Sequence, residues 1–198
     1  IAMNEFFAVS PAIEDILKKS PALYAVIDRA PEFGLPSYYV AAGCIVQTVW
    51  NALYGLPALH GIDDIALVYF DGHDLSAAAA RNREAQAGHF FEGSPFRLDV
   101  KNEARVHLWY AKKFGFEIAP YRSCEDAIRS FPTTATAVGV RKTEEGLLVF
   151  APYGVEDMLA GVVRPNKAQI TEVVYRAKAD KWKAKWPGLT VVPWGYGT

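Results

Sequence analysis

The chain has 198 residues, of which 51% are hydrophobic and 22% charged, a composition that excludes disorder and supports one domain with a well-filled core. Its formal net charge of −1 excludes a general attraction to nucleic acids or membranes, so polyanion binding would need a local patch. No apolar run reaches the roughly 18 residues of a membrane span, and we expect no secretory signal. The two cysteines, Cys44 and Cys124, match no metal or redox spacing, which indicates reduced thiols in a cytoplasmic protein.

The first third of the chain predicts helices around one buried strand. Serine–proline pairs at 10–11 and 20–21 each provide a cap and an N1 proline, so two short helices are expected between residues 10 and 30. The aromatic and small apolar residues of 37–43 predict a strand that ends at Gly43. Residues 44–55 then have helical spacing, with Gly55 as the stop.

The middle of the chain alternates strands and helices. The apolar run 65–70 predicts a second buried strand, and Ser76 is placed to cap an alanine-rich helix that extends to about Phe91. Residues 96–102 alternate as a strand does. An amphipathic helix is expected over 103–115, with Asn102 as its N-cap.

The last third is mixed. Ser123 begins a short helix that ends by Pro132, and a Glu-Glu-Gly turn at 144–146 predicts a hairpin between two apolar runs. A further short helix is expected over 154–159, and residues 177–186 form a basic, aromatic helix.

This order of elements is typical of α/β or α+β proteins, and we predict an α+β fold with a small mixed sheet covered by helices. Strands near 38–42, 64–70 and 97–101 should be neighbours, with the helix from residue 44 packed on one face. We predict a single domain over 1–198, with a core of about 35–115 and an appended hairpin and helices over about 116–198.

Three features of the predicted sheet carry chemistry. A strand ends at Gly43, where backbone N–H groups of the following helix could meet phosphates. Asp64 begins the second strand, and Asp99 lies within the third. Side chains two apart share one face of a strand. A strand with aspartates at positions i and i+2, beside a neighbouring strand with a third aspartate, would therefore place three carboxylates together, and such a group suits two Mg²⁺ ions.

Several stretches resemble the nucleotidyltransferase superfamily that includes DNA polymerase β, and more closely a bacterial nucleotidyltransferase-like family. The matching stretches, between about residues 38 and 166 with one more near the end, are AAGCIVQTVWNALYG, DIALVYFDGHDLS, DVKNEARVHLWYAKKFG, FPTTATAVGVR, LLVFAPYGVEDML, VVRPN and KWPGLTV. The resemblance implies Mg²⁺-dependent transfer of NMP from a nucleoside triphosphate to a hydroxyl acceptor.

The residues that match the family's site divide into two groups. The resemblance implies Asp64 and Asp99 as catalytic residues and metal ligands, and the Gly43-Cys44 turn as the nucleotide-binding phosphate seat. Lys101 and Arg105 follow Asp99 closely, and they either contact the nucleotide's phosphates or form surface ion pairs.

One departure from the family's pattern bears on activity. Ala66 stands where the family has the second aspartate, so Asp64 and Asp99 suffice for one Mg²⁺ but not clearly for two. Asp63 could substitute only if the strand begins at Asp64. Two hypotheses follow: a transferase weakened by Ala66, and a catalytically inactive nucleotide-binding or protein-interaction module with the same fold.

Other charged residues have simpler interpretations. Asp71 and Asp74 are expected to border the strand and cap turns. The four histidines have wide, irregular spacings that form no zinc motif. The lysines of 177–186, with Trp182 and Trp186, could bind an RNA backbone, but a solvated helix face is the interpretation we favour. Membrane partners are not expected.

Overall fold

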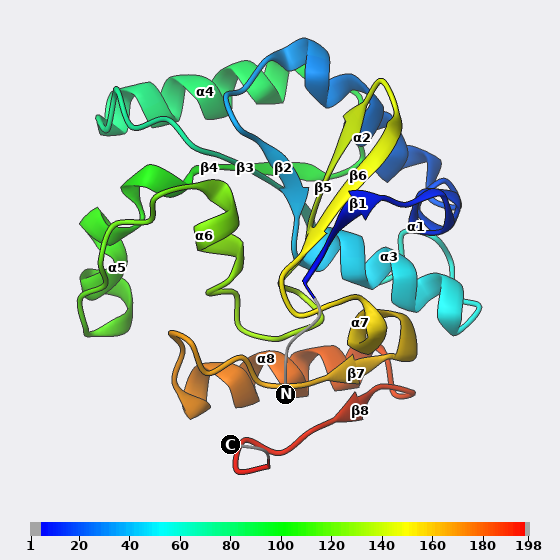
Figure 1. The fold of residues 1–198 in the computed structure, drawn as a ribbon. Helices are drawn as coiled ribbons and strands as arrows, with labels where there is room; N and C mark the ends of the chain where they lie inside the picture. The colour runs from blue at the N-terminus through cyan, green and yellow to red at the C-terminus, as the bar shows by residue number, and fades with distance from the viewer. Residues whose placement is uncertain (1–4, 197–198) are drawn as a thin grey trace.

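A computed structural model describes residues 5–196, and its centre is one six-stranded sheet (Figure 1). The strand order is β1-β6-β5-β2-β3-β4. All neighbours are antiparallel except β3 and β4, which are parallel. The strands are β1 (Phe6–Val9), β2 (Tyr39–Ala41), β3 (Asp64–Tyr69), β4 (Arg97–Asn102), β5 (Gly139–Thr143) and β6 (Gly146–Ala151). A second, two-stranded parallel sheet joins β7 (Val162–Val163) to β8 (Thr190–Val191).

Helices surround this sheet, so the predicted α+β fold is confirmed. They are α1 (Pro11–Leu17), α2 (Pro21–Phe33), α3 (Gly43–Leu53), α4 (Ala77–Phe90), the 3₁₀ turn η1 (Glu103–Arg105), α5 (His107–Phe114), α6 (Cys124–Ile128), α7 (Glu156–Ala160) and α8 (Glu172–Lys185). Within residues 5–196, none of these helices has the length and apolar character needed to cross a bilayer.

Serine caps form at three of the four expected helix starts, and Ser20, the exception, makes no cap hydrogen bond with its side chain. The side chains of Ser10, Ser76 and Ser123 each accept a hydrogen bond from the backbone N–H three residues on. Asn102 accepts from the N–H of Ala104 and caps the 3₁₀ turn η1, whereas the expected continuous helix over 103–115 is wrong because α5 begins only at His107. These caps satisfy backbone donors that a helix start would otherwise leave without partners.

The predicted neighbourhood of β2, β3 and β4 is confirmed, and α3 packs on one face of these strands. The hairpin of β5 and β6 lies nearer the centre of the molecule than the sequence indicates, because β5 pairs directly with β2. β1 is not predicted at all, and it pairs with β6 across more than half of the chain.

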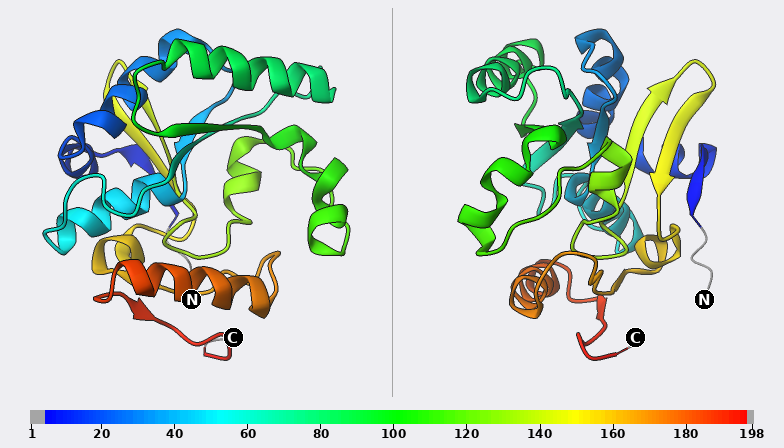
Figure 2. Two further views of the ribbon diagram at one scale, coloured as in Figure 1. Left: turned by 180° about the vertical axis from the view of Figure 1, so that it is seen from behind. Right: turned by 60° about the vertical axis from the view of Figure 1, so that its left-hand side comes forward.

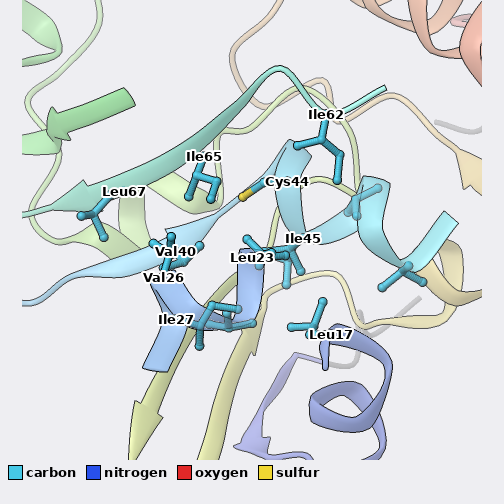
Figure 3. Packing of buried hydrophobic residues seen from close by; sticks show 14 of the residues in the cluster. Leu17, Leu23, Val26, Ile27, Val40, Cys44, Ile45, Ile62, Ile65 and Leu67 are labelled. Atoms are coloured by element: carbon cyan, nitrogen blue, oxygen red, sulfur yellow. The ribbon is translucent and has the colours of Figure 1, made fainter. Parts of the chain in front are cut away.

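The two faces of the sheet differ in what covers them (Figure 2). On one face, side chains of β2 and β3 such as Val40, Ile65 and Leu67 pack with α1, α2 and α3 in the main core (Figure 3). On the other face, Val68 packs in a smaller cluster with Ile128 of α6. The rest of this second face, toward Asp64 and Asp99, remains open to form a cleft.

Candidate active-site cleft

The parallel pair β3 and β4 brings the predicted aspartates to one face of the sheet. Asp64 pairs in register with Arg97, and Ala66 pairs with Asp99. Because alternate residues of a strand point to the same side, Asp64, Ala66 and Asp99 all line one cleft of about 350 Å³. As expected, Ala66 faces the same cleft as Asp64 and Asp99.

Both aspartates have cationic neighbours on β4. The Asp64 carboxylate is 2.8 Å from the Arg97 guanidinium, and Asp99 is 3.6 Å from the Lys101 ammonium. The aspartate side chains are 41% and 37% exposed, so these are weak surface ion pairs that a stronger cation could replace.

The donor set bears on how many metal ions the cleft can hold. Across residues 5–196, no three histidine, cysteine, aspartate or glutamate side chains gather into a metal-binding group. Ala66 contributes no ligand between the two aspartates. Mg²⁺ accepts one or two carboxylates when waters and substrate phosphates complete its six ligands, so Asp64 and Asp99 fit one ion and do not fit two.

Asp63 also lines the cleft, because β3 begins only at Asp64 and the preceding residue is free of the strand's alternation. Its carboxylate is 3.1 Å from the Lys185 ammonium and 3.7 Å from that of Lys181. The hydrogen bond from Lys185 holds the pKa of Asp63 below its usual value. Asp63 is therefore engaged by α8, and the two lysines would have to release it before it could bind a metal.

The start of α3 opens into the same cleft. Ala42 and Gly43 line it, and Ala42 has the unusual angles φ 59° and ψ −129°. The Cys44 side chain points instead into the core, where its thiol donates to the carbonyl of Ala41 and burial raises its pKa to about 12 (Figure 3). Only the backbone of Cys44 is thus available to a ligand at this turn.

The two predicted cations lie apart. Lys101 lines the cleft next to Asp99. The Arg105 guanidinium donates to the carbonyl of Leu75 at 2.8 Å, and Arg105 is not among the residues that line the cleft. Asp71 and Asp74 accept hydrogen bonds from backbone N–H groups two residues on, which are the bordering roles that the sequence predicts.

Sequence reasoning missed the buried acid Glu103, whose side chain lines the cleft although the residue is only 3% exposed. Burial raises its pKa to about 7, with Lys101 opposing and Asp99 adding to that rise. Strand alternation gives no signal for it, because β4 ends at Asn102 and Glu103 begins the 3₁₀ turn η1.

The other side of the cleft comes from α8, through Lys178, Lys181 and Trp182. The sequence predicts a basic helix here, but no local pattern places it against the aspartates. Gln47, Phe131 and Thr136 also line the cleft and were not predicted.

The mixed sheet and its covering helices match the fold of a nucleotidyltransferase head domain. The family described as "Nucleotidyltransferase" matches residues 28–191, and this chain belongs to that family. No curated protein matches the chain.

Solved structures agree with this assignment. A structure determined by NMR and described as revealing a CCA-adding enzyme head domain shares 27% identity with this chain, with a TM-score of 0.76; the alignment covers 91% of this chain and 94% of that one. The Thermotoga maritima CCA-adding enzyme complexed with tRNA shares 15% identity, with a TM-score of 0.53, over 95% of this chain. A CCA-adding enzyme complexed with ATP shares 16% identity, with a TM-score of 0.52, over 94% of this chain. This chain spans 43% and 42% of the last two, which therefore support the fold alone.

Proposed function

We propose that the cleft binds a nucleoside triphosphate with one Mg²⁺ and transfers NMP to a hydroxyl acceptor. The observation that carries this proposal is that Asp64 and Asp99, from two parallel strands, face one cleft beside the start of α3. Membership of the nucleotidyltransferase family supports a nucleoside triphosphate as substrate. The acceptor is not specified by these residues.

The residues that line the cleft would have separate roles in binding the nucleotide and in the transfer. Asp64 and Asp99 would hold the metal ion, which would neutralise charge on the triphosphate. Backbone N–H groups at Gly43 and Cys44 would contact phosphate oxygens, because the first donors of a helix have no partners within it. Lys101 would stabilise charge that develops as the acceptor oxygen attacks the α-phosphorus and pyrophosphate leaves. The acceptor's proton passes to water.

A second candidate function is nucleotide binding without transfer. The observation that favours it is Ala66, which faces the cleft beside Asp99 and supplies no ligand. Transfer by the two-metal mechanism needs a site for each ion, whereas binding of a single Mg²⁺–nucleotide does not.

Both candidates are tested by calorimetric titration with each of the four ribonucleoside triphosphates and Mg²⁺, followed by an assay for pyrophosphate release in the presence of a panel of small-molecule, protein and RNA hydroxyl acceptors. Transfer predicts binding together with slow release that Asp99→Asn abolishes. Asp74→Asn is the matched control, because Asp74 only caps an exposed turn. Binding without release would support the second candidate, and the absence of binding for all four nucleotides would contradict both.

A further inference from the structure

Helix α8 is fixed to α3, the helix whose first turn opens into the cleft. The rings of Trp182 and Trp186 lie 5.8 Å and 5.4 Å from the ring of Trp50 on α3, in edge-to-face arrangements. The Trp186 indole donates a hydrogen bond of 2.7 Å to the side chain of Asn51, in a buried position. Charges on α8 are therefore held in a defined position across from the aspartates.

Two of these charges, Lys178 and Lys181, line the cleft and form what we call the lysine pair. Within residues 5–196, Lys178 forms no ion pair with a carboxylate. The nearest carboxylate to Lys181 is that of Asp63 at 3.7 Å, and Asp63 lies closer to Lys185. In the described part of the chain, neither lysine therefore makes an ion pair shorter than 3.7 Å, although Asp64 attracts the charge of Lys178.

The surroundings of Lys178 disfavour its positive charge. Lys178 is an exposed residue, as a ligand-binding group must be, yet its ammonium group is partly desolvated and lies 5.9 Å from the centre of the Trp182 ring. This desolvation, together with the neighbouring charges of Lys113, Lys181 and Lys101, holds the pKa of Lys178 below its usual value. Mutual repulsion among lysines costs free energy that a bound polyanion would offset.

We propose that Lys178 and Lys181 bind the β- and γ-phosphates, so that the triphosphate chain lies between α8 and the Asp64–Asp99 edge. The proposal rests on the proposed function for the identity of the ligand, and it adds a phosphate-binding side of the cleft that the first turn of α3 does not supply. A condensed phosphate chain fits better than a nucleic-acid backbone, because the cleft is a local hollow of about 350 Å³ and the whole chain has no excess positive charge.

The test is calorimetric titration with inorganic triphosphate, with and without Mg²⁺, for wild type and variants of the lysine pair. Lys178→Gln and Lys181→Gln should each weaken binding by about tenfold, because each removes a charge-assisted contact to phosphate. Lys178→Arg, which keeps the charge, should weaken it by no more than about threefold. Thermal melts of every variant confirm that it is folded.

Lys112→Gln is the matched control, because it removes one positive charge from an exposed residue that does not line the cleft. It should leave triphosphate binding within about twofold of wild type. Binding by Lys178→Gln equal to that of wild type would overturn the proposal. The absence of triphosphate binding in wild type would also overturn it. The same holds if Lys178→Gln loses binding to a single-stranded oligoribonucleotide but keeps binding to triphosphate.

The failure of this proposal and that of the proposed function can be told apart. If triphosphate binding depends on the lysine pair but no pyrophosphate is released from any nucleotide, then the phosphate site stands and transfer fails. If Asp99→Asn abolishes pyrophosphate release while Lys178→Gln binds triphosphate normally, then transfer stands and the lysine pair is not the phosphate site.

Discussion

Ala66 on β3 lies directly beside Asp99 on β4 in the parallel register, and both face the cleft that Asp64 also lines. An aspartate at position 66 would point toward the same space as the other two carboxylates. The absence of this group separates the chain from a complete two-metal site, and its position makes the consequence testable by one substitution.

Ala66→Asp should add the missing carboxylate. Without metal, the variant should melt at a lower temperature than wild type, because a third carboxylate among two others raises their pKa values and repels them. With Mg²⁺, its melting temperature should rise more than that of wild type, since binding stabilises the folded state. Ala78→Asp, at an exposed position of α4, controls for the added charge. Equal metal responses of Ala66→Asp and wild type would show that the cleft is not built for metal.

Ala42→Gly should stabilise the protein by about 1 kcal/mol, because glycine adopts a positive φ without the strain that alanine pays. Ala42 has φ 59° at the start of α3, whereas Ala41 is an ordinary residue of β2. Ala41→Gly is therefore the matched control and should destabilise. Urea unfolding of both variants measures the difference, and a loss of stability in Ala42→Gly would contradict the account of strain at this turn.

Glu103→Gln should change the pH dependence of stability. The pKa of Glu103 is raised from 4.5 to about 7 by burial. Because the folded protein binds this proton more tightly than the unfolded chain does, protonated Glu103 contributes its full stabilisation below about pH 4.5. This stabilisation is lost as the pH rises through about 7. Between these two pH values, the free energy of unfolding of wild type should fall by up to roughly 3 kcal/mol relative to that of the glutamine variant. Denaturant unfolding of both proteins at about pH 5 and pH 8.5 measures this change. If wild type and the variant differ in stability by the same amount at both pH values, a titrating Glu103 is excluded.

Asn51→Leu should destabilise the protein by about 2 to 4 kcal/mol, because it leaves several buried groups without partners. The Asn51 side chain accepts from the Trp186 indole and donates to the carbonyls of Ala58 and His60. Thr48→Val on the same helix removes only a bond to the helix's own backbone, and it should cost about 1 kcal/mol or less. Similar losses for both variants would contradict the anchoring role of Asn51.

Strong local patterns predicted the central part of the fold. Strand β3 was expected at 65–70 and lies at Asp64–Tyr69, because a continuous apolar run between turn residues has few alternatives. β1 was missed because it is a four-residue edge strand, and its pairing with β6 depends on contacts far apart in the sequence.

The part of the site that depends on strand alternation and on the pairing of neighbouring strands could be predicted from the sequence. The expectation that Asp64, Ala66 and Asp99 would share a face followed from the period of a strand, and the structure confirms it. The position of α8 follows from the packing of tryptophans on Trp50, which no local pattern encodes. Cys44 faces the core rather than the cleft because its thiol lies on the buried side of α3.

The most direct test of a nucleoside triphosphate site in this cleft is a nitrogen-15 NMR titration with ATP and Mg²⁺. The account predicts that the largest shift changes occur at the backbone amides of Gly43, Ala66 and Asp99 and at the indole of Trp182, all of which line the cleft. Changes confined to the separate cavity beside Tyr121 and Arg122, or no changes at saturating nucleotide, would contradict it.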